Sequence, residues 1–274
     1  MITINKPKFC TRSVYESCVN SVKDDNLRNK FTEIIESIVN FSKDYDKKAQ
    51  KEELFQLIPN NNDNSDFIIQ SVTKEELKSL YSQHMVERNK PARKIYDDLL
   101  NQAPICPFCG FGQATTLDHY LPKSKFPCLS VLPLNLVPSC KDCNTGKGNK
   151  LVVLAEQQPM HPYYDHHYFN SEQWLFAKVE ESEPVVIKYY VNPPQNWTDI
   201  SKKRVKAHFD SFGLGKRFSV QAANELSSIV PRRFPSLLNE HAENEFKNNK
   251  NSWKTAMYQA LSKSDWYCVE GCKE

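Results

Sequence analysis

Hydrophobic residues recur at helical spacing along the first part of the chain. One apolar face with the period of a helix consists of Phe31, Ile34, Ile35, Ile38 and Phe41. The polar run PNNNDNSD at residues 59–66 then favours a loop, because Asn and Asp adopt turns readily and Pro59 ends the preceding helix. We therefore expect residues 1 to about 58 to be mainly helical.

Two more helices are expected before the middle of the chain. Thr73 followed by Glu76 matches a capping box, in which each side chain bonds the backbone N–H of the other residue. The helix that it opens has an apolar face of Leu77, Leu80, Tyr81 and Met85. Pro91 starts the next helix, whose apolar face consists of Ile95, Tyr96, Leu99 and Leu100.

The block at residues 104–150 differs from both of its neighbours. Cysteine, proline and glycine concentrate in it, and it lacks a long helical period. Beyond it, residues 174–179 and 184–191 have the composition of two strands joined by EESE, which predicts a β-hairpin. Helical spacing of hydrophobic residues returns over residues 199–274.

These patterns predict an α+β protein in which a small irregular core is inserted in a mainly helical body. We divide the chain into a helical N-terminal region at residues 1–103, a core at 104–170, and a β-hairpin with a helical C-terminal region at 171–274. The length of 274 residues suits one large domain or two small ones.

Composition limits location and partners. The apolar runs are too short for a transmembrane helix, and the first residues lack the apolar stretch of a signal peptide. We therefore expect a cytoplasmic protein with no membrane partner. Lysine and arginine number 36, against 33 acidic residues, for a net charge of +3. This mild bias permits nucleic-acid binding without arguing for it.

Nine cysteines in a chain with no expected export signal indicate metal binding rather than disulfides. Cys106 and Cys109 form one C-x-x-C pair, and Cys140 and Cys143 form another. A single pair would also fit a redox motif, but two pairs supply the four thiolates of a closed structural zinc site. The remaining cysteines lack this spacing and are interpreted as ordinary thiols: Cys10, Cys18, Cys128, Cys268 and Cys272.

Candidate catalytic groups lie between and beside the cysteine pairs, because a four-cysteine zinc site leaves no coordination position for substrate. Asp118 and the Asn144 amide offer the hard oxygen ligands that suit Mg²⁺ or Mn²⁺. His119 could deprotonate an attacking water. Asp118 and His119 share one site only if their strand ends or kinks there, and Pro122 favours such an end.

The segments CPFCG, LDHYLPKSKFP and PLNLVPSCKDCNTGKGNK resemble the HNH endonuclease family in its zinc-bearing form. The resemblance implies a ββα-metal unit, in which zinc clamps two strands, their connecting loop and a helix. It also implies hydrolysis of a phosphodiester by water, leaving 5′-phosphate and 3′-hydroxyl ends. The helix would begin near residues 140–144, and its free N-terminus would favour phosphate.

Carried over by position, the resemblance assigns a role to four residues. His119 is the general base, and Asp118 is a ligand of the catalytic divalent ion. Asn135 is the central asparagine, which steadies the loop and the base. Asn144 ligates the same ion, although an asparagine at the start of a helix also serves as an ordinary cap.

Other polar residues near the motif are further candidates. Contacts with a nucleic-acid backbone are expected of Lys123, Lys125, Lys147 and Lys150, each of which could equally be a solvated surface residue. His161, in the segment HPYYD, is a candidate for support of the active site. The wider group of Asp165, His166 and His167 around it is interpreted as packing rather than as a second metal site.

Flanking segments resemble the HNH subunits of bacterial anti-phage systems, such as the Septu and related retron-associated nucleases. These segments are KIYDDLLNQAPICPFCG, HPYYD and NSWKTAMYQALSKSDWYC, and they imply an ABC-type or SMC-like ATPase as partner. DNA is the favoured substrate and RNA, such as a tRNA, is the alternative, because the motif does not distinguish them. A non-catalytic zinc-ribbon module that binds nucleic acid or protein is the remaining hypothesis.

Overall fold

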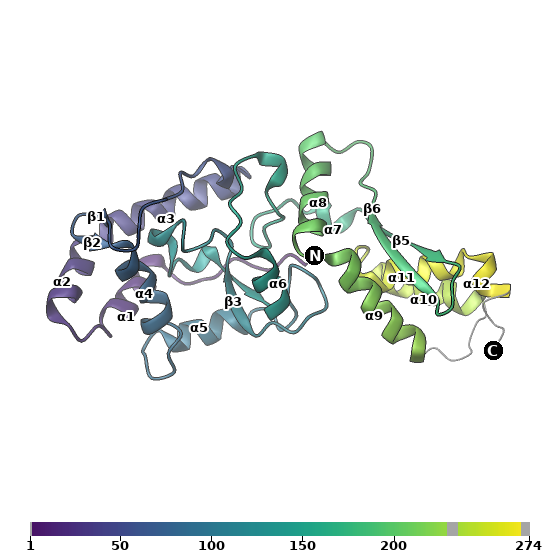
Figure 1. The fold of residues 1–274 in the computed structure, drawn as a ribbon, viewed down its shortest axis with the longest axis horizontal. Helices are drawn as coiled ribbons and strands as arrows, with labels where there is room; N and C mark the ends of the chain where they lie inside the picture. Colours follow the sequence, from purple (N-terminus) through teal and green to yellow (C-terminus); the bar gives the residue numbers. More distant parts are fainter. Residues whose placement is uncertain (1, 229–234, 270–274) are drawn as a thin grey trace. The chain divides into compact units, whose positions relative to one another are not determined.

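The computed structural model describes residues 2–228 and 235–269 (Figure 1). The protein is a mixed α and β protein with many helices, and its described strands form three two-stranded sheets. It divides into two compact units. The cysteine-bearing unit comprises residues 2–155 and 161–165, and the hairpin unit comprises residues 156–160 and 166–274. The sequence-based boundaries after residues 103 and 170 stay a prediction.

Six helices, four short strands and three 3₁₀ turns build the cysteine-bearing unit. The helices are α1 (Thr11–Val19), α2 (Asp25–Glu33), α3 (Ile35–Gln50), α4 (Lys74–His84), α5 (Arg93–Leu100) and α6 (Lys141–Lys147). The strands are β1 (Phe67–Ile69), β2 (Val72–Thr73), β3 (Thr116–His119) and β4 (Leu136–Ser139). The 3₁₀ turns are η1 (Leu54–Gln56), η2 (Pro127–Leu129) and η3 (Pro133–Asn135).

The apolar face predicted near residue 35 is only partly continuous. Phe31, Ile34 and Ile38 are buried, but Phe41 is 45% exposed. The reason is a break between two helices, since α2 ends at Glu33 and Ile34 leaves helical geometry with φ −93° and ψ 2°. Residues on either side of this break therefore do not share one straight face.

The helix predicted to start after Thr73 is confirmed as α4. The Thr73 hydroxyl accepts from the Glu76 backbone N–H, and the Glu76 carboxylate accepts from the Thr73 N–H. All four residues of its predicted apolar face are buried in the core of this unit: Leu77, Leu80, Tyr81 and Met85. This cap and burial fix the helix that later proves to touch the candidate site.

Strands β3 and β4 pair antiparallel, and α6 follows β4 directly and packs against β3 (Figure 1). Leu117 in β3 lies opposite Pro138 in β4. Proline has no N–H to donate, and the backbone groups of Leu117 instead bond two tyrosine hydroxyls: Tyr96 accepts from its N–H and Tyr81 donates to its carbonyl. The helix predicted to begin near Cys140 does so, with Cys140 as its N-cap.

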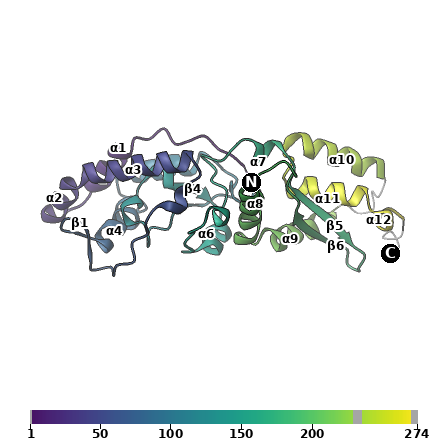
Figure 2. The same ribbon diagram turned by 90° about the horizontal axis from the view of Figure 1, so that it is seen from above.

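The hairpin unit confirms the predicted β-hairpin with slightly shifted ends. Its elements are α7 (Tyr168–Ser171), β5 (Leu175–Glu180), β6 (Val186–Val191), α8 (Asp199–Ser211), α9 (Leu214–Ser228), α10 (Pro235–Asn248), α11 (Trp253–Ser262) and α12 (Asp265–Val269). Helix α9 packs on β6, and α11 lies between β5 and α10 (Figure 2). Across the described residues, each helix is too short or too polar to cross a membrane.

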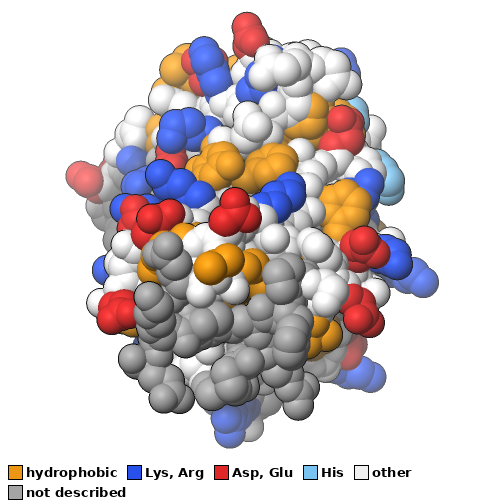
Figure 3. All heavy atoms as spheres, turned by 90° about the vertical axis from the view of Figure 1, so that its right-hand side faces the viewer, with side chains coloured by type: hydrophobic (Ala, Val, Ile, Leu, Met, Phe, Trp, Pro, Cys, Tyr) orange, Lys and Arg blue, Asp and Glu red, His pale blue; other side chains and the backbone are white. Residues whose placement is uncertain are grey.

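Charges of both signs are mixed on the face of the protein that Figure 3 shows. Figure 3 shows lysine and arginine side chains next to aspartate and glutamate side chains, with exposed hydrophobic side chains between them. An anionic polymer is attracted by a field of one sign, so this face does not stand out as a nucleic-acid surface.

Candidate functional site

The four cysteines predicted to bind zinc lie together in the cysteine-bearing unit. All four are buried, and their sulfur atoms lie within 4.8 Å of one another. The Sγ atoms of Cys109 and Cys140 are 3.8 Å apart. A tetrahedral zinc ion with Zn–S bonds of about 2.3 Å needs sulfur atoms about 3.8 Å apart, so the cluster fits zinc in both ligand type and spacing.

Backbone turns around the first cysteine pair shape this cluster. Gly110 adopts a left-handed conformation with φ 75°, and its N–H donates to the Cys106 carbonyl at 2.8 Å. The Gly112 N–H donates to the Cys109 sulfur at 3.4 Å. An added Cβ on Gly112 would lie 3.0 Å from the Cys140 sulfur, so a side chain here would fit only if Cys140 moved.

The four thiols of the cluster differ in how readily they lose a proton, because hydrogen bonds from neighbouring thiols raise the pKa of Cys106 and Cys143. A hydrogen bond from Cys106 lowers the pKa of the Cys109 thiol to about 6, and the same neighbour lowers the pKa of Cys140. Thiolates are the form that binds zinc. The other described cysteines lie outside the cluster, namely Cys10, Cys18, Cys128 and Cys268, while Cys272 is outside the described residues.

Asp118 is buried and held by a lysine. Lys147, the last residue of α6, donates from Nζ to Asp118 Oδ2 at 2.8 Å and to the His119 carbonyl at 2.5 Å. Burial raises the pKa of Asp118, and the Lys147 ammonium opposes that rise. Lys147 was predicted to contact nucleic acid, but its side chain is only 8% exposed, so it ties α6 to β3 instead.

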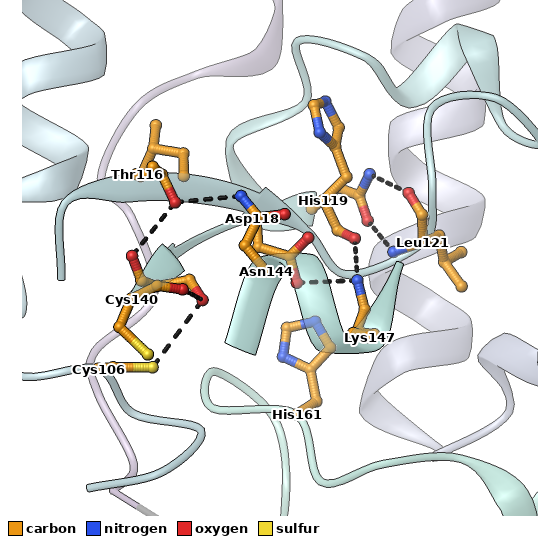
Figure 4. Close-up of polar contacts among 12 residues, drawn as sticks. Cys106, Thr116, Asp118, His119, Leu121, Cys140, Asn144, Lys147 and His161 are labelled. Atoms are coloured by element: carbon orange, nitrogen blue, oxygen red, sulfur yellow. Dashed lines mark hydrogen bonds and ion pairs between the residues drawn. The ribbon is translucent and has the colours of Figure 1, made fainter. Parts of the chain in front are cut away.

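The His119 side chain turns away from Asp118. Strand β3 ends at His119 as predicted, yet the expected convergence of the two side chains is not found. The His119 ring packs edge-on against the Tyr81 ring at a centroid distance of 4.4 Å, and Nε2 lies 2.8 Å from the Ser130 carbonyl. Figure 4 shows the imidazole pointing away from Lys147 and His161. Neighbouring residues in a strand alternate between faces, which accounts for the divergence.

The hydrogen bond to Ser130 sets the tautomer of His119. A carbonyl only accepts, so Nε2 carries the proton and Nδ1 keeps its lone pair. Nδ1 has no hydrogen-bond partner among residues 2–228 and 235–269, and it is not one of their fully enclosed atoms. Burial lowers the pKa of His119 to about 3, which keeps the imidazole neutral.

Asn144 lies on the α6-facing side of β3. Its Nδ2 donates to the Thr116 hydroxyl at 3.1 Å, two residues before Asp118 in the strand (Figure 4). Its Oδ1 has no hydrogen-bond partner within the described part of the chain. A carboxylate and a free amide oxygen fit a hard divalent ion in donor type. The Lys147 ammonium already neutralises one carboxylate oxygen of Asp118, so such an ion would compete with it.

Asn135 clamps the loop between β3 and β4. It is fully buried, its Oδ1 accepts from the Leu121 N–H at 2.8 Å, and its Nδ2 donates to the Leu121 carbonyl at 3.0 Å and the Leu129 carbonyl at 3.3 Å. Leu129 immediately precedes Ser130. Asn135 therefore ties residue 121 of the loop to residue 129, which directly precedes the residue whose carbonyl bonds His119.

His161 lies outside the strand pair and α6, and its ring is held among tyrosine residues. Its Nδ1 accepts from the Tyr163 N–H at 3.2 Å, and its Nε2 lies 2.9 Å from the Tyr45 hydroxyl, which donates to the Leu134 carbonyl. Its ring also lies 4.0 Å from the Tyr120 ring. The neighbouring Asp165 carboxylate accepts from the His161 N–H, and the only metal-ligand group among the described residues is the four cysteines.

The other three predicted lysines lie in different surroundings. Lys123 Nζ lies 4.7 Å from the centre of the Tyr81 ring, and burial lowers its pKa. Lys125 donates to the Asn61 side chain at 2.8 Å. Lys150 is exposed after the end of α6. Only Lys123 is brought close to His119, whose pKa its charge helps to lower.

Tyr81 is the site residue that sequence reasoning missed. Its helical spacing with Leu77 and Leu80 indicates core packing, and the residue is indeed buried. Beyond this packing, the Tyr81 hydroxyl bonds the Leu117 carbonyl, and its ring contacts His119 and Lys123. No local sequence pattern predicts which strand a helix will pack against. The one available signal is chemical: a buried tyrosine needs a hydrogen-bond partner.

Comparison with known proteins gives one informative relative. No family model matches the chain, and no solved structure is similar to it. Protein Ea31 of Escherichia phage lambda is 36% identical over 222 residues, which cover 72% of this chain and 75% of Ea31. That name states no activity. The similarity is strong and covers most of both proteins, so the chain belongs to the family of the phage lambda protein Ea31.

Proposed function

We propose that the protein is an HNH-type endonuclease that hydrolyses phosphodiester bonds in nucleic acid, with a zinc ion that stabilises its core. One observation carries the proposal. The four-cysteine cluster joins the turn before β3 to the start of α6, and β3 and α6 carry Asp118, His119 and Asn144. A strand pair followed by a helix and clamped by cysteines agrees with the ββα-metal unit that the motif implies.

His119 supports this proposal through its tautomer. A general base needs a lone pair at neutral pH and a fixed orientation. The Ser130 carbonyl holds the proton on Nε2, which leaves Nδ1 able to accept a proton from water. The low pKa weakens a free imidazole as a base, but the negative charge of a bound phosphate raises the pKa of a nearby base.

Asp118 and Asn144 would hold a Mg²⁺ or Mn²⁺ ion, which supplies positive charge against the phosphate and the leaving oxygen. The residues of the chain itself have complementary tasks. Lys147 neutralises the buried carboxylate, and Asn135 fixes the loop that carries the Ser130 carbonyl. Lys123, Lys125 and Lys150 offer cationic groups for the backbone of the substrate.

The wider role is also part of the proposal. We place the nuclease in an anti-phage defence complex with an ABC-type or SMC-like ATPase, on the basis of the flanking segments. The relative in phage lambda neither supports nor opposes this role, because its name states no activity. Co-purification of the protein with the products of neighbouring genes tests the partner.

A second function is favoured by one specific observation. The His119 imidazole and the Asp118 carboxylate diverge, which suits a zinc-ribbon module that binds nucleic acid or protein without cutting it. The same surface would then serve recognition, and the buried Asp118–Lys147 pair would be purely structural.

A substrate panel separates these functions. The zinc-loaded protein is incubated with plasmid DNA, single-stranded DNA and tRNA, with Mg²⁺ or Mn²⁺, both alone and with any ATPase that co-purifies. The nuclease proposal predicts cleavage with 5′-phosphate and 3′-hydroxyl ends, favouring DNA. Cleavage of tRNA alone would select the RNA alternative. Binding without cleavage of any substrate under every condition would support the non-catalytic module and contradict the proposal.

A further inference from the structure

We propose that Tyr81 in α4 is a positioning residue that holds the His119 imidazole next to the Lys123 ammonium, so that Lys123 binds one phosphate group of a nucleic-acid backbone beside the imidazole. The proposal rests on the proposed nuclease function and extends it to a helix outside the cysteine-framed motif.

The Tyr81 ring touches both partners. Its centroid lies 4.4 Å from that of the His119 ring, with the two planes inclined at 72°, and the Lys123 Nζ lies 4.7 Å from the same centroid. Edge-to-face rings and a cation over a ring face are both attractive arrangements. The Tyr81 side chain thus limits the rotation of both the His119 imidazole and the Lys123 ammonium.

Tyr81 is itself firmly anchored. Its hydroxyl donates to the Leu117 carbonyl at 3.0 Å, and Leu117 lies two residues before His119 in β3. Its helix begins with the Thr73–Glu76 capping box and is packed into the core. The Tyr81 ring is therefore fixed to β3, the strand that also carries His119. The distance and angle between the two rings thus depend on a helix and a strand.

Lys123 brings an unneutralised charge to this place. No carboxylate of the described residues lies within ion-pair distance of its ammonium. Two other charged side chains act on the pKa of Lys123. Lys78 lowers it, and Glu75, which is itself paired with Lys78, raises it. A partly buried ammonium without a counter-ion gains more from a phosphate than a fully solvated one does, because less water screens the interaction.

The His119 ring offers a hydrogen-bond acceptor beside the phosphate that Lys123 would bind. Nε2 is committed to the Ser130 carbonyl, whereas Nδ1 has no partner in the described part of the chain and is not fully enclosed. A water between this nitrogen and a phosphate bound to Lys123 could donate one hydrogen bond to Nδ1 and one to the phosphate. The cation and the acceptor nitrogen thus belong to neighbouring side chains that both pack against Tyr81.

The test follows the His119 ring directly by NMR. Ring C–H signals are recorded from protein with labelled histidines, the signal of His119 among the seven histidines is assigned with His119→Gln, and inorganic phosphate is added without Mg²⁺ or Mn²⁺. The variants are Lys123→Gln, Tyr81→Phe and Tyr81→Leu. Lys94→Gln, an exposed lysine of α5, and Tyr96→Phe, which also loses a hydroxyl bonded to Leu117, are matched controls.

We expect phosphate to shift the His119 signal of the wild type and of both controls with equal affinity. Lys123→Gln should weaken phosphate binding about tenfold, the loss of one charge-assisted hydrogen bond. Tyr81→Phe keeps the packed ring but loses its bond to Leu117 and should move the signal only slightly, whereas Tyr81→Leu should move it strongly even without phosphate. Phosphate affinity unchanged by Lys123→Gln, or a His119 signal that is the same in Tyr81→Leu and Tyr81→Phe, would overturn the proposal.

These readouts separate the pair from the nuclease chemistry. Phosphate binding at His119 and Lys123 in a protein that cuts no substrate would contradict the proposed function and leave the phosphate pair standing. Cleavage that Lys123→Gln and Tyr81→Leu do not slow would contradict the pair and leave the nuclease standing. Lys123 is only partly buried, so its variant tests the proposal even if Tyr81→Leu fails to fold.

Discussion

Lys147 donates a hydrogen bond of 2.8 Å to the Asp118 carboxylate, and both side chains are almost completely buried. This ion pair joins the last residue of α6 to the middle of β3, across the face that also carries Asn144. It is the main polar link between the helix and the strand whose residues the nuclease proposal depends on.

Replacement of this lysine should destabilise the cysteine-bearing unit. Lys147→Met leaves Asp118 buried without its counter-charge, and we expect the free energy of unfolding to fall by about 3 kcal/mol. Denaturant unfolding, followed by far-ultraviolet circular dichroism, measures the change in the free energy of unfolding. Lys141→Met, at an exposed position of the same helix, should change stability by less than about 0.5 kcal/mol. Equal losses in the two variants would show that the ion pair has no structural role.

Zinc should be required for the fold of residues 104–150. Structural zinc contributes its binding free energy to folding, so removal with a chelator should lower the thermal stability of this segment and increase its amide hydrogen exchange. Cys140→Ser should do the same, whereas Cys10→Ser, at an exposed thiol outside the cluster, should not. Purified wild-type protein that contains no zinc and responds to no chelator would refute this assignment.

Gly112 offers a gentler test of the same cluster. A Cβ at this position would lie 3.0 Å from both Cβ and Sγ of Cys140. Gly112→Ala should therefore push the second cysteine pair outward and weaken zinc binding by about tenfold or more, measured by competition with a chromogenic chelator. Gly146→Ala is the control, because nothing lies within 4 Å of the added methyl group. The same zinc affinity in both variants would argue against a tightly packed metal site.

Asn135 should matter for stability as well as for activity. Asn135→Ala leaves the Leu121 N–H and carbonyl without their partners inside the protein and removes one of the two hydrogen bonds to the Leu129 carbonyl, so we expect a loss of about 3 kcal/mol in unfolding free energy. Asn224→Ala, at an exposed position of α9, is the control and should be nearly neutral. A loss below about 1 kcal/mol for Asn135→Ala would mean that the loop does not depend on this clamp.

Features encoded locally were predictable from the sequence. The capping box of α4, the β-hairpin of β5 and β6, the start of α6 and the grouping of four cysteines all depend on residues near one another or on the strict spacing of metal ligands. Helix caps, strand alternation and C-x-x-C pairs each carry their own physical requirement, so a single sequence displays them.

Contacts between distant elements were not predictable. The partner of Asp118 lies on another element, and Lys147 has no sequence feature that distinguishes a buried amine from a solvated one. The direction of the His119 ring is set by Ser130 and by Tyr81, which belong to a loop and a helix far from it in the sequence. The short pair β1 and β2 was missed because strands of two or three residues show no alternation.

The central claim is that His119 acts on a phosphodiester bond, and single-turnover cleavage measures it most directly. The rate is determined for an end-labelled substrate with Mn²⁺ and excess protein, for wild type, His119→Ala and the control His241→Ala, an exposed histidine of α10. We predict that His119→Ala lowers the rate at least about 100-fold, as expected for the loss of a general base, while zinc content and the His241→Ala rate stay unchanged. Equal rates for wild type and His119→Ala would contradict the account.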